Sequence, residues 1–344
     1  MALLLRDTHV QELHNRAIVK MGDYKNAIRE AYHQHGLGQA QSIPRENLWV
    51  QKKSRNIEPS NTIGHDVPEK PAGSLKVLAC SLPELDTMGV VSYAAGFGRS
   101  PEMWHLLYST REGRLTGVIQ AHDVAWMKTG AVGALAAELL ALRKETYRIG
   151  VFGSGRQAWT QVLGLASTVK IESIKVHSRT EAHRNAFAER IRKEMRLPVI
   201  PVATPEETVR DEDIVVTITT AKEPVLSGEW LKPGMHVNAI GAHYPDIREV
   251  DDETVRRSRI IVDIMAQALV EKGDLLIPLA RGVINKDDLR AELGEVVCGS
   301  KPGRLSDSEI TLFCSGGTAI EHIAAAHMVL EKARQNGFGV SIPD

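Results

Sequence analysis

The sequence has little cysteine, almost no net charge and no long apolar run, and each shortage excludes a class of protein. Its three cysteines, Cys80, Cys298 and Cys314, include no CxxC pair, and their odd number argues against a disulfide framework. Thirteen histidines show neither an HExxH motif nor paired Cys/His spacing, so we expect no metal site. The net charge of −1 leaves no strongly basic surface for nucleic acid or a membrane.

No apolar run reaches the roughly 20 residues that a transmembrane helix needs. The leucine run at residues 3–5 is too short, and too soon followed by charges, to be a signal peptide. Because the cysteine use also fits a reducing compartment, we expect a cytoplasmic protein. The hydrophobic content of 43% and the charged content of 25% are those of a globular protein, and 344 residues predict two domains.

What the sequence does contain is a glycine turn between two strand-like runs. The apolar residues 149–152 lead into Gly153-Ser154-Gly155, and a helix-like segment (157–167) and a second strand-like run (174–176) follow. Strand, glycine turn, helix and strand in this order open a dinucleotide-binding βαβ unit. We therefore predict a Rossmann-type, doubly wound α/β domain. A domain of this kind that binds no nucleotide is the alternative.

Each small residue of the turn has its own task in this interpretation. Gly153 permits the tight turn, and Gly155 lets the main chain approach a pyrophosphate. Ala158 takes the third position, where a small side chain allows close packing of helix and strand. The helix that begins near Arg156 and Gln157 offers free N–H groups to the phosphates.

The end of the second strand indicates which dinucleotide is bound. An NAD site usually has Asp or Glu there, about twenty residues after the turn, to bind the ribose 2′-hydroxyl. This chain has His177-Ser178-Arg179-Thr180 instead. Arg179 can pair with a 2′-phosphate, and Ser178 and Thr180 can donate hydrogen bonds to it. We predict NADP(H) rather than NAD, with a solvated surface arginine as the alternative interpretation of Arg179.

The segments before and after the dinucleotide-binding region predict a second domain with a different fold. Residues 1–40 look helical, 51–73 look like a loop, and 74–120 hold short runs typical of an antiparallel sheet. A helix with an alanine-rich apolar face is expected over 122–143. A long helix from Ala319 to about Gln335 fits neither the nucleotide fold nor a tail, so we expect it to return to the first domain.

Six stretches in this order give the chain a family likeness. They are SIPRENL (42–48), LPELDTMGV (82–90), GRLTGVIQAHDVAWMKTGAVGALAAELLA (113–141), GSGRQA (153–158), EPVLSGEWLKPGMHVNAIGAH (223–243) and ITLFCSGGTAIEHIAAA (310–326). Over nearly its whole length the chain resembles the ornithine cyclodeaminase/mu-crystallin family. The resemblance implies a Rossmann domain (129–310) inserted into an α+β dimerisation and substrate domain built from both chain ends (1–128 and 311–344).

The resemblance also implies a set of cofactor residues. Thr129 matches a threonine that contacts a cofactor phosphate, and Thr217, Thr219 and Ile240 match positions that line the nicotinamide side. With the residues of the turn and of the second strand, the predicted cofactor-binding set is Thr129, Gly153, Ser154, Gly155, Arg156, Gln157, Ser178, Arg179, Thr180, Thr217, Thr219 and Ile240.

The substrate positions depart from the family pattern. Arg45 matches the first substrate-carboxylate arginine, and Lys128 stands where the second is usual. A lysine keeps the positive charge of an arginine but lacks the planar guanidinium that binds a carboxylate through two hydrogen bonds. The family's lysine falls on Val91, and Lys76 fits only in a shifted register, so Lys76 or no lysine fills that position.

The family's two aspartates also have no counterpart at their positions. The catalytic aspartate falls on His243, with Asp246 three residues on, and the aspartate of the final helix falls on His322. A histidine can carry a proton near neutral pH, so we predict His243 and Lys128 as catalytic residues. We expect His322 to pack or to support the site from behind.

Taken together, the sequence predicts an NADP(H)-dependent oxidoreductase acting on a small carboxylate-bearing imine, amine or carbonyl compound. A nicotinamide supplies the hydride, and the protein must orient one carbon and manage one proton. One alternative is a cyclodeaminase-like lyase with tightly bound NAD(P). Another is an inactive nucleotide-bound binding protein, as in the mu-crystallin branch. A symmetric homodimer is expected through the first domain, because 74–120 has few helices to cover its sheet.

Overall fold

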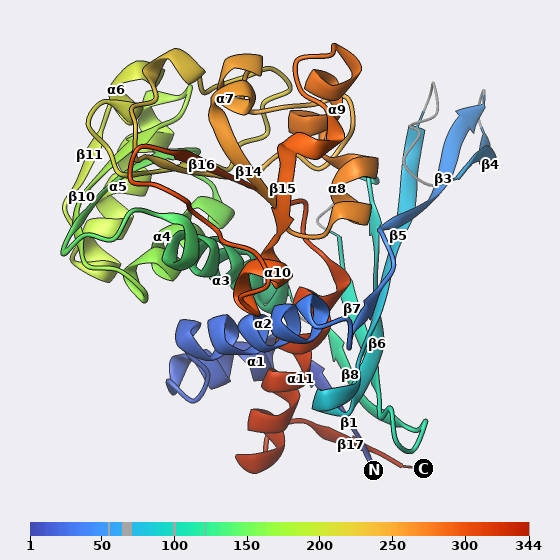
Figure 1. The fold of residues 1–344 in the computed structure, drawn as a ribbon. Helices are drawn as coiled ribbons and strands as arrows, with labels where there is room; N and C mark the ends of the chain where they lie inside the picture. Colours follow the sequence, from blue (N-terminus) through green and yellow to red (C-terminus); the bar gives the residue numbers. More distant parts are fainter. Residues whose placement is uncertain (54–55, 64–70, 99–100, 121, 344) are drawn as a thin grey trace. The chain divides into compact units, whose positions relative to one another are not determined.

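The computed structural model describes residues 1–53, 56–63, 71–98, 101–120 and 122–343 and folds into two compact units (Figure 1). The first unit comprises Met1–Lys128 and Thr318–Asp344, and the second comprises Thr129–Gly317. The chain passes from the first to the second within helix α3 (His122–Leu140).

The second unit is built on a parallel sheet that reads as eight strands over the described residues. In spatial order these are β11 (Val199–Pro201), β10 (Ile171–His177), β9 (Tyr147–Phe152), β12 (Ile214–Thr217), β13 (His236–Ala239), β16 (Ile310–Cys314), β14 (Ser258–Val262) and β15 (Leu289–Glu292). The first five follow the 3-2-1-4-5 order of a Rossmann sheet, whose direction of winding changes between β9 and β12. The predicted fold class is therefore confirmed.

Helices cover both faces of this sheet. Besides α3 they are α4 (Arg156–Ala166), α5 (Glu181–Met195), α6 (Pro205–Val209), α7 (Asp252–Arg257), α8 (Met265–Glu271), α9 (Gly273–Ala280) and α10 (Leu293–Val297), with 3-10 turns at Gly228–Trp230 and Lys286–Asp288. Every residue of β12, β13 and β16 is buried. Burial on both faces explains why β12 and β16 are mostly apolar.

The first unit is built on a mostly antiparallel sheet of nine strands over the described residues. Its path is β17 (Val340–Ile342), β1 (Ala2–Arg6), β8 (Leu115–Gln120), β7 (Met103–Tyr108), β6 (Thr87–Ala95), β5 (Pro71–Leu82), β3 (Glu46–Lys53) and β4 (Asn56–Ile63), and β2 (Gln41–Ser42) pairs with β5. Among the described residues of this sheet, only the β1–β8 pairing is parallel.

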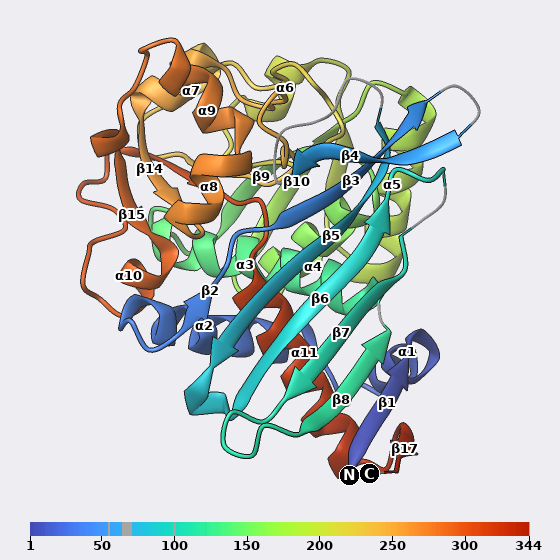
Figure 2. The ribbon, with the colours of Figure 1, turned by 90° about the vertical axis from the view of Figure 1, so that its right-hand side faces the viewer.

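One face of that sheet, called the inner face here, is covered by helix α11 (Ala319–Gln335), which Figure 2 shows crossing behind β6 and β7. Helix α2 (Met21–Gly36) packs on α11, and α1 (Asp7–Asn15) follows β1. Alternation decides which residues of β5 face inward: Lys76, Leu78, Cys80 and Leu82 are buried, whereas Ala79 and its odd-numbered neighbours are half-exposed.

Three expectations from the sequence are wrong. Residues 51–73 are not a loop throughout, because β3 extends to Lys53 and β4 pairs with it; 54–55 and 64–70 lie outside the described residues. The N-terminus is not all helical, since β1 pairs with β8. The segment 311–317 lies in the second unit rather than the first, because β16 pairs with β13 and β14 in the parallel sheet.

Candidate active site

The glycine turn lies at the carboxyl end of β9, beside the end of β12. Gly153 has a φ of +118°, and a Cβ added to it would lie 2.4 Å from the carbonyl oxygen of Ile218. Only glycine fits that conformation and that approach. A Cβ on Gly155 would meet nothing within 4 Å, so the main chain there faces open space.

Helix α4 begins directly after this open main chain. Gly155 is its N-cap, so no side chain satisfies the first N–H groups of the helix. Those N–H groups and the positive end of the helix dipole suit an anionic phosphate. The residues at this turn therefore fit a dinucleotide, and Ser154, Arg156 and Gln157 lie around the same N-terminus.

Helix α3 packs closely against α4 within the second unit. The Gln161 side chain donates a hydrogen bond to the carbonyl oxygen of Thr129 at 2.6 Å. A Cβ on Gly130 would lie 2.2 Å from the Thr160 carbonyl oxygen, so the two helix backbones are almost in contact. Thr129 is thus held beside the helix that the glycine turn begins.

The end of β10 carries the residues predicted to select the cofactor. Ser178 is half-buried, and Arg179 and Thr180 are exposed. The Ser178 hydroxyl donates to the Thr180 carbonyl oxygen at 3.3 Å, which tightens the turn into α5. The first acid after this strand is Glu181, which is exposed and lies 3.8 Å from Arg184.

The ends of β12 and β13 present further groups predicted to meet the cofactor. Thr217 is fully buried, and its hydroxyl oxygen has no hydrogen-bond partner among the residues that the structure describes. Buried hydroxyls rarely stay without a partner, so this one fits a bound ligand. Ile240 is 7% exposed, and its N–H donates to the Thr217 carbonyl oxygen at 3.0 Å.

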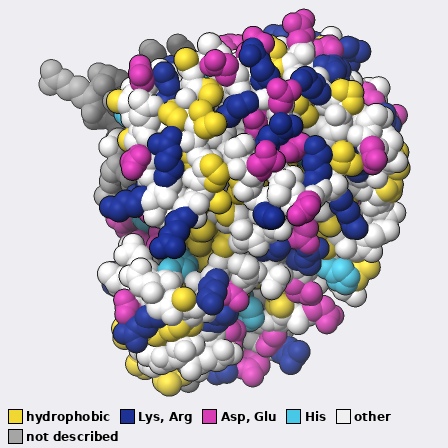
Figure 3. All heavy atoms as spheres, turned by 90° about the vertical axis from the view of Figure 1, so that its left-hand side faces the viewer, with side chains coloured by type: hydrophobic (Ala, Val, Ile, Leu, Met, Phe, Trp, Pro, Cys, Tyr) yellow, Lys and Arg dark blue, Asp and Glu magenta, His cyan; other side chains and the backbone are white. Residues whose placement is uncertain are grey.

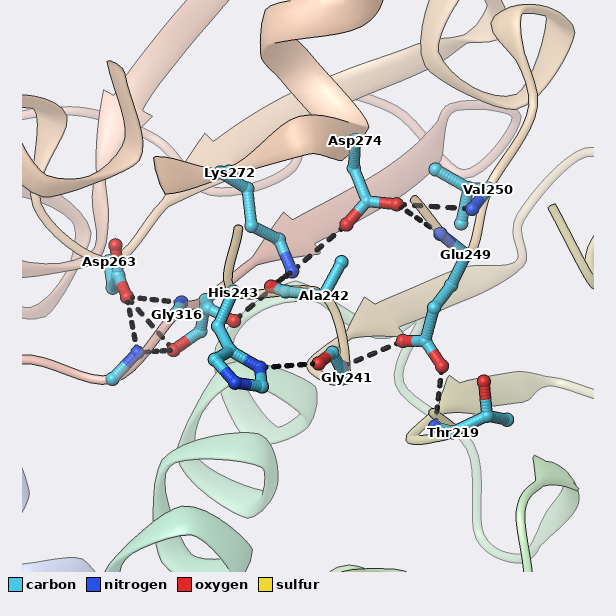
Figure 4. A network of polar contacts seen from close by, with 12 residues as sticks. Thr219, Gly241, Ala242, His243, Glu249, Val250, Asp263, Lys272, Asp274 and Gly316 are labelled. Carbon is cyan, nitrogen blue, oxygen red and sulfur yellow. Dashed lines mark hydrogen bonds and ion pairs between the residues drawn. The ribbon is translucent and has the colours of Figure 1, made fainter. Parts of the chain in front are cut away.

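A network of buried charges holds the loops that follow these strands (Figure 4). Glu249 accepts hydrogen bonds from the N–H groups of Thr219 and Gly241, at 2.5 and 2.7 Å. Asp274 accepts from the N–H groups of Glu249 and Val250 at 2.7 and 3.1 Å. The loops after β12 and β13 are thereby tied to α9.

Lys272 joins the same network from the start of α9. Its ammonium lies 3.0 Å from Asp274 and donates to the carbonyl oxygens of Ala242 and Ser315 at 2.8 and 3.2 Å. Burial opposes the charged form of Lys272, but Asp274, Cys314 and Glu249 outweigh it and raise its pKa. Burial, followed by the charge of Asp274, raises the pKa of Glu249.

Asp263, directly after β14, closes the network on its other side. One of its oxygens accepts from the Ser315 hydroxyl and from the N–H groups of Gly316 and Gly317, at 2.9, 2.9 and 3.1 Å. None of these four residues, Asp263, Glu249, Lys272 and Asp274, was predicted from the sequence as a site residue. A charged residue after an apolar strand, as at Asp263, was the one available signal.

His243 lies on the loop that this network holds. The side chain is exposed, and its Nδ1 lies 3.0 Å from the Gly241 carbonyl oxygen, beside the Tyr244 ring. A carbonyl can only accept, so Nδ1 carries the proton and Nε2 is the basic nitrogen of the neutral ring. That tautomer suits a residue that accepts a proton at Nε2.

In the first unit, three buried cations lie among α3, β5 and the residue before β3. Arg45, Lys76 and Lys128 are 4%, 2% and 3% exposed. Lys128 forms an ion pair of 2.7 Å with the fully buried Glu321, which also accepts from the Tyr32 hydroxyl at 2.6 Å. Lys128 therefore already has a counter-ion within the protein, which the sequence analysis did not foresee.

The sheet register shows where the two lysine candidates lie. Lys76 pairs with Asn47 of β3 and Tyr93 of β6, and its ammonium lies 6.0 Å from the centre of the Trp49 ring. Val91 pairs with Leu78 and His105 and is fully buried in the apolar row beside it. The side chains of Lys76 and Val91 both face inward. Of the two, only Lys76 is charged, and it lies on β5 beside β3, the strand that Arg45 directly precedes.

Two buried histidines, His105 and His322, also lie at the inner face. His105 Nδ1 lies 3.3 Å from the Ile119 carbonyl oxygen, and His105 Nε2 lies 3.2 Å from His322 Nδ1. Burial lowers the pKa of His105 to about 4. Burial, then Lys128, His105 and Arg45, lowers the pKa of His322 well below its usual value. Both rings are therefore neutral near pH 7, and Arg45, Lys128 and His322 belong to one cluster.

The described part of the chain holds neither a membrane-spanning helix nor a cluster of metal ligands. None of its helices is long and apolar enough to cross a membrane. It also holds no group of three or more His, Cys, Asp or Glu side chains placed to bind a metal ion. Charged side chains of both signs are interspersed on the face shown in Figure 3.

The sheet order and the glycine turn at its switch point define a Rossmann-type α/β protein, and comparison with known proteins gives its family. Residues 8–337 match the model of the ornithine cyclodeaminase/mu-crystallin family. The chain is 32% identical to an alanine dehydrogenase of Archaeoglobus fulgidus over 326 residues, 95% of both chains. It is 33% identical to a Delta(1)-pyrroline-2-carboxylate reductase of Bacillus cereus over 238 residues, 69% of this chain and 73% of that one. The chain belongs to the ornithine cyclodeaminase/mu-crystallin family.

Solved structures show the same fold along the whole chain. The Thermococcus litoralis Delta(1)-pyrroline-2-carboxylate reductase, in complex with NADH and L-proline, has a TM-score of 0.86 and 29% identity and covers 99% of this chain and 100% of its own. An archaeal alanine dehydrogenase dimer with bound NAD has a TM-score of 0.85 and 29% identity, with 99% of both chains covered.

Proposed function

We propose that this protein is an NADP(H)-dependent oxidoreductase that acts at a carbon bearing nitrogen in a small carboxylate-bearing imine or amine. The observation that carries the proposal is the open glycine turn at the switch point of the parallel sheet, followed by an uncapped helix N-terminus. The names of the two relatives describe the oxidation of an amino acid and the reduction of a cyclic imine acid. Both names support this reaction class.

The choice of NADP(H) rests on the end of β10. The two solved relatives hold NADH and NAD, so they support a nicotinamide cofactor for this protein. They do not decide whether that cofactor carries the 2′-phosphate of NADP(H). Here the strand ends in His177, Ser178 and Arg179, with no carboxylate until Glu181. A guanidinium pairs with a phosphate through charge-assisted hydrogen bonds, whereas a carboxylate would repel it.

The substrate carboxylate is assigned to the buried cations of the first unit. Arg45 offers a planar fork, and Lys76 and Lys128 offer point charges. Since Glu321 already neutralises Lys128, we assign Arg45 and Lys76 the larger share of carboxylate binding. Lys128 then orients Glu321 as well as the substrate. Lys76, rather than Val91, fills the position of the family's lysine in this proposal.

The protein's own residues must handle one proton. When bound, the nicotinamide supplies the hydride. His243 accepts or donates the proton of the reacting nitrogen through Nε2, because its Nδ1–H is engaged by the Gly241 carbonyl. Thr219 and Ile240 fix the main chain on the side where the nicotinamide is expected.

Product analysis separates this function from a lyase or a binding protein. We expect NADPH to be oxidised in proportion to substrate when cyclic imine acids and 2-oxo acids are screened. A lyase of the cyclodeaminase kind would turn over with no net change in NADPH, and a binding protein would do neither. Efficient conversion of ornithine to proline without net NADPH change would contradict the proposal.

We further propose a symmetric homodimer through the outer face of the antiparallel sheet. That face carries an open hollow of about 530 Å³, whose lining includes Ala79, Met88, Val90 and Tyr108. A half-exposed apolar sheet face favours pairing with a second copy. The archaeal alanine dehydrogenase was solved as a dimer. Light scattering at micromolar concentration is expected to report twice the chain mass, and a monomer would contradict it.

A further inference from the structure

The carboxyl edge of the parallel sheet holds more buried acid than base. Asp263, Glu249 and Asp274 are fully buried, and so is Lys272, the one cation in their network among the described residues. Glu271, 1% exposed, is a further acid close to Gly316. Three carboxylates of the network therefore face one ammonium.

The hydrogen bonds and the ion pair of these three carboxylates stabilise their ionised forms and act against the burial that raises the pKa of Glu249. Both oxygens of Glu249 accept from main-chain N–H groups. One oxygen of Asp274 accepts from two N–H groups, and the other lies 3.0 Å from the Lys272 ammonium. The second oxygen of Asp263 accepts from the N–H of Ile264 at 2.7 Å. Since five of the six oxygens accept hydrogen bonds and the sixth lies beside the Lys272 ammonium, a carboxylic acid proton would have to face a donor or a cation.

The excess negative charge lies where the nicotinamide is expected. Glu249 binds the main chain of Thr219 and Gly241, and Lys272 binds that of Ala242 (Figure 4). These loops follow Thr217 and Ile240 in the chain. Open α/β sheets bind their ligands at this edge. A nicotinamide ring is neutral when reduced and carries one positive charge when oxidised. Negative charge buried nearby stabilises the oxidised ring more than the reduced one.

We propose that this acid cluster, Asp263, Glu249 and Asp274, biases the bound nicotinamide pair toward hydride donation, so that the equilibrium on the enzyme favours the reduced substrate. The inference rests on the proposed function for the identity of the cofactor. In the favoured direction the reduced ring loses a hydride to the substrate carbon and becomes cationic. The substrate nitrogen takes one proton, so charge and electrons balance. The acid cluster favours the hydride loss, because that step makes the ring cationic.

The test compares the affinities of NADP⁺ and NADPH, because their ratio follows the potential of the bound pair. Glu249→Gln removes one negative charge at nearly constant size. We expect it to raise the ratio Kd(NADP⁺)/Kd(NADPH) by at least about tenfold, as one charge within about 10 Å would at an effective dielectric constant near 20. Lys272→Met removes the positive charge and should lower the same ratio. Damage to the fold alone would not shift the two ratios in opposite directions.

Glu212→Gln is the matched control. Glu212 is also a buried glutamate of the second unit, 3% exposed, but it precedes β12 and pairs with Lys175 at 2.9 Å at the amino edge of the sheet. The ratio Kd(NADP⁺)/Kd(NADPH) of the Glu212→Gln variant should stay within about twofold of the wild-type value. If Lys272→Met does not fold, Asp274→Asn replaces it and should shift the ratio in the same direction as Glu249→Gln.

The outcomes separate the inference from the proposed function. If the wild-type protein binds neither nucleotide, the proposed cofactor is wrong, and the inference falls with it. If both bind and the ratio in Glu249→Gln equals that in Glu212→Gln, the function stands and the inference is overturned. A ratio that moves upward only in Glu249→Gln and Asp274→Asn supports it.

Discussion

Arg179 is the residue on which the choice between NADPH and NADH depends. It stands exposed at the end of β10 with no acid before Glu181. We expect NADPH to bind at least about tenfold more tightly than NADH, since a charge-assisted contact contributes roughly 1.5–3 kcal/mol and about 1.4 kcal/mol is tenfold. Arg179→Asp should reverse the preference in a fluorescence titration.

Arg143→Asp controls for the change of charge. Arg143 is also exposed, but it precedes β9 and so lies at the amino edge of the parallel sheet. The preference for NADPH should survive this substitution. Equal affinities for NADPH and NADH in the wild-type protein would contradict the assignment of Arg179.

Lys128 is now expected to matter for stability as much as for substrate binding. Lys128→Met would leave Glu321 buried without its cation, which typically costs about 3–5 kcal/mol of unfolding free energy. The double variant Lys128→Met/Glu321→Gln removes both charges, so it should regain a large part of that loss. Urea denaturation of the two variants measures the difference. Equal stability of the single and double variants would show that the pair is not coupled.

At the level of single elements, the glycine turn and α4 form the part whose requirements are strictest. Gly153→Ala would place a Cβ 2.4 Å from the Ile218 carbonyl at a φ of +118°, so we expect loss of both stability and NADPH binding. Gly155→Ala meets nothing within 4 Å and should fold normally but bind NADPH more weakly, because its methyl group occupies the path of the phosphates. Thermal melting and NADPH titration distinguish the two. A Gly155→Ala protein with wild-type affinity would place the phosphates elsewhere.

The same element shows what the sequence can predict. Gly153, Gly155 and α4 are contiguous, so their spacing alone specifies a strand, a turn and a helix. The central strands β12 and β16 were predictable for a similar reason, since burial on both faces makes them mostly apolar.

Contacts between distant parts of the chain could not be predicted in this way. Lys128 and Glu321 are 193 residues apart, and His105 and His322 are 217 apart. No local pattern marks a charge that will be buried against a partner so far along the chain. The same holds for Glu249 and Asp274, whose partners are mostly main-chain N–H groups. The strand β4 was missed because its composition is polar and its pairing with β3 is what makes it a strand.

For the molecule as a whole, buried histidines predict how stability depends on pH. Burial lowers the pKa of His14 and His105 to about 4 and of His236 to about 3, from 6.5. Between these values the unfolded chain binds protons that the folded chain does not, so stability is full above pH 6.5 and falls as the pH falls. From pH 7 to pH 5 we expect a loss of roughly 2 kcal/mol for each such histidine.

The half-buried His122 acts in the opposite direction. Desolvation alone would lower its pKa, but hydrogen bonds to Asp7 and Pro101 and the charge of Asp7 raise it, so its contribution is present at low pH and is lost as the pH rises. Urea midpoints at pH 7 and pH 5 measure the net effect. His105→Gln should flatten the dependence, whereas His183→Gln, at an exposed position in α5, should not. Midpoints that do not change between pH 7 and pH 5 would contradict this account.

The most direct test of the proposed function compares two substrates that differ only in their carboxylate. Initial rates of NADPH oxidation are measured with a cyclic imine that carries a carboxylate beside the C=N bond and with the same imine lacking it, in the wild-type protein and in Arg45→Gln. We predict that the wild type prefers the carboxylate form by at least about tenfold in kcat/KM, as one lost charge-assisted contact implies, and that Arg45→Gln loses most of this preference while its NADPH affinity is unchanged. Equal rates on the two imines, or no NADPH oxidation with either, would contradict the account.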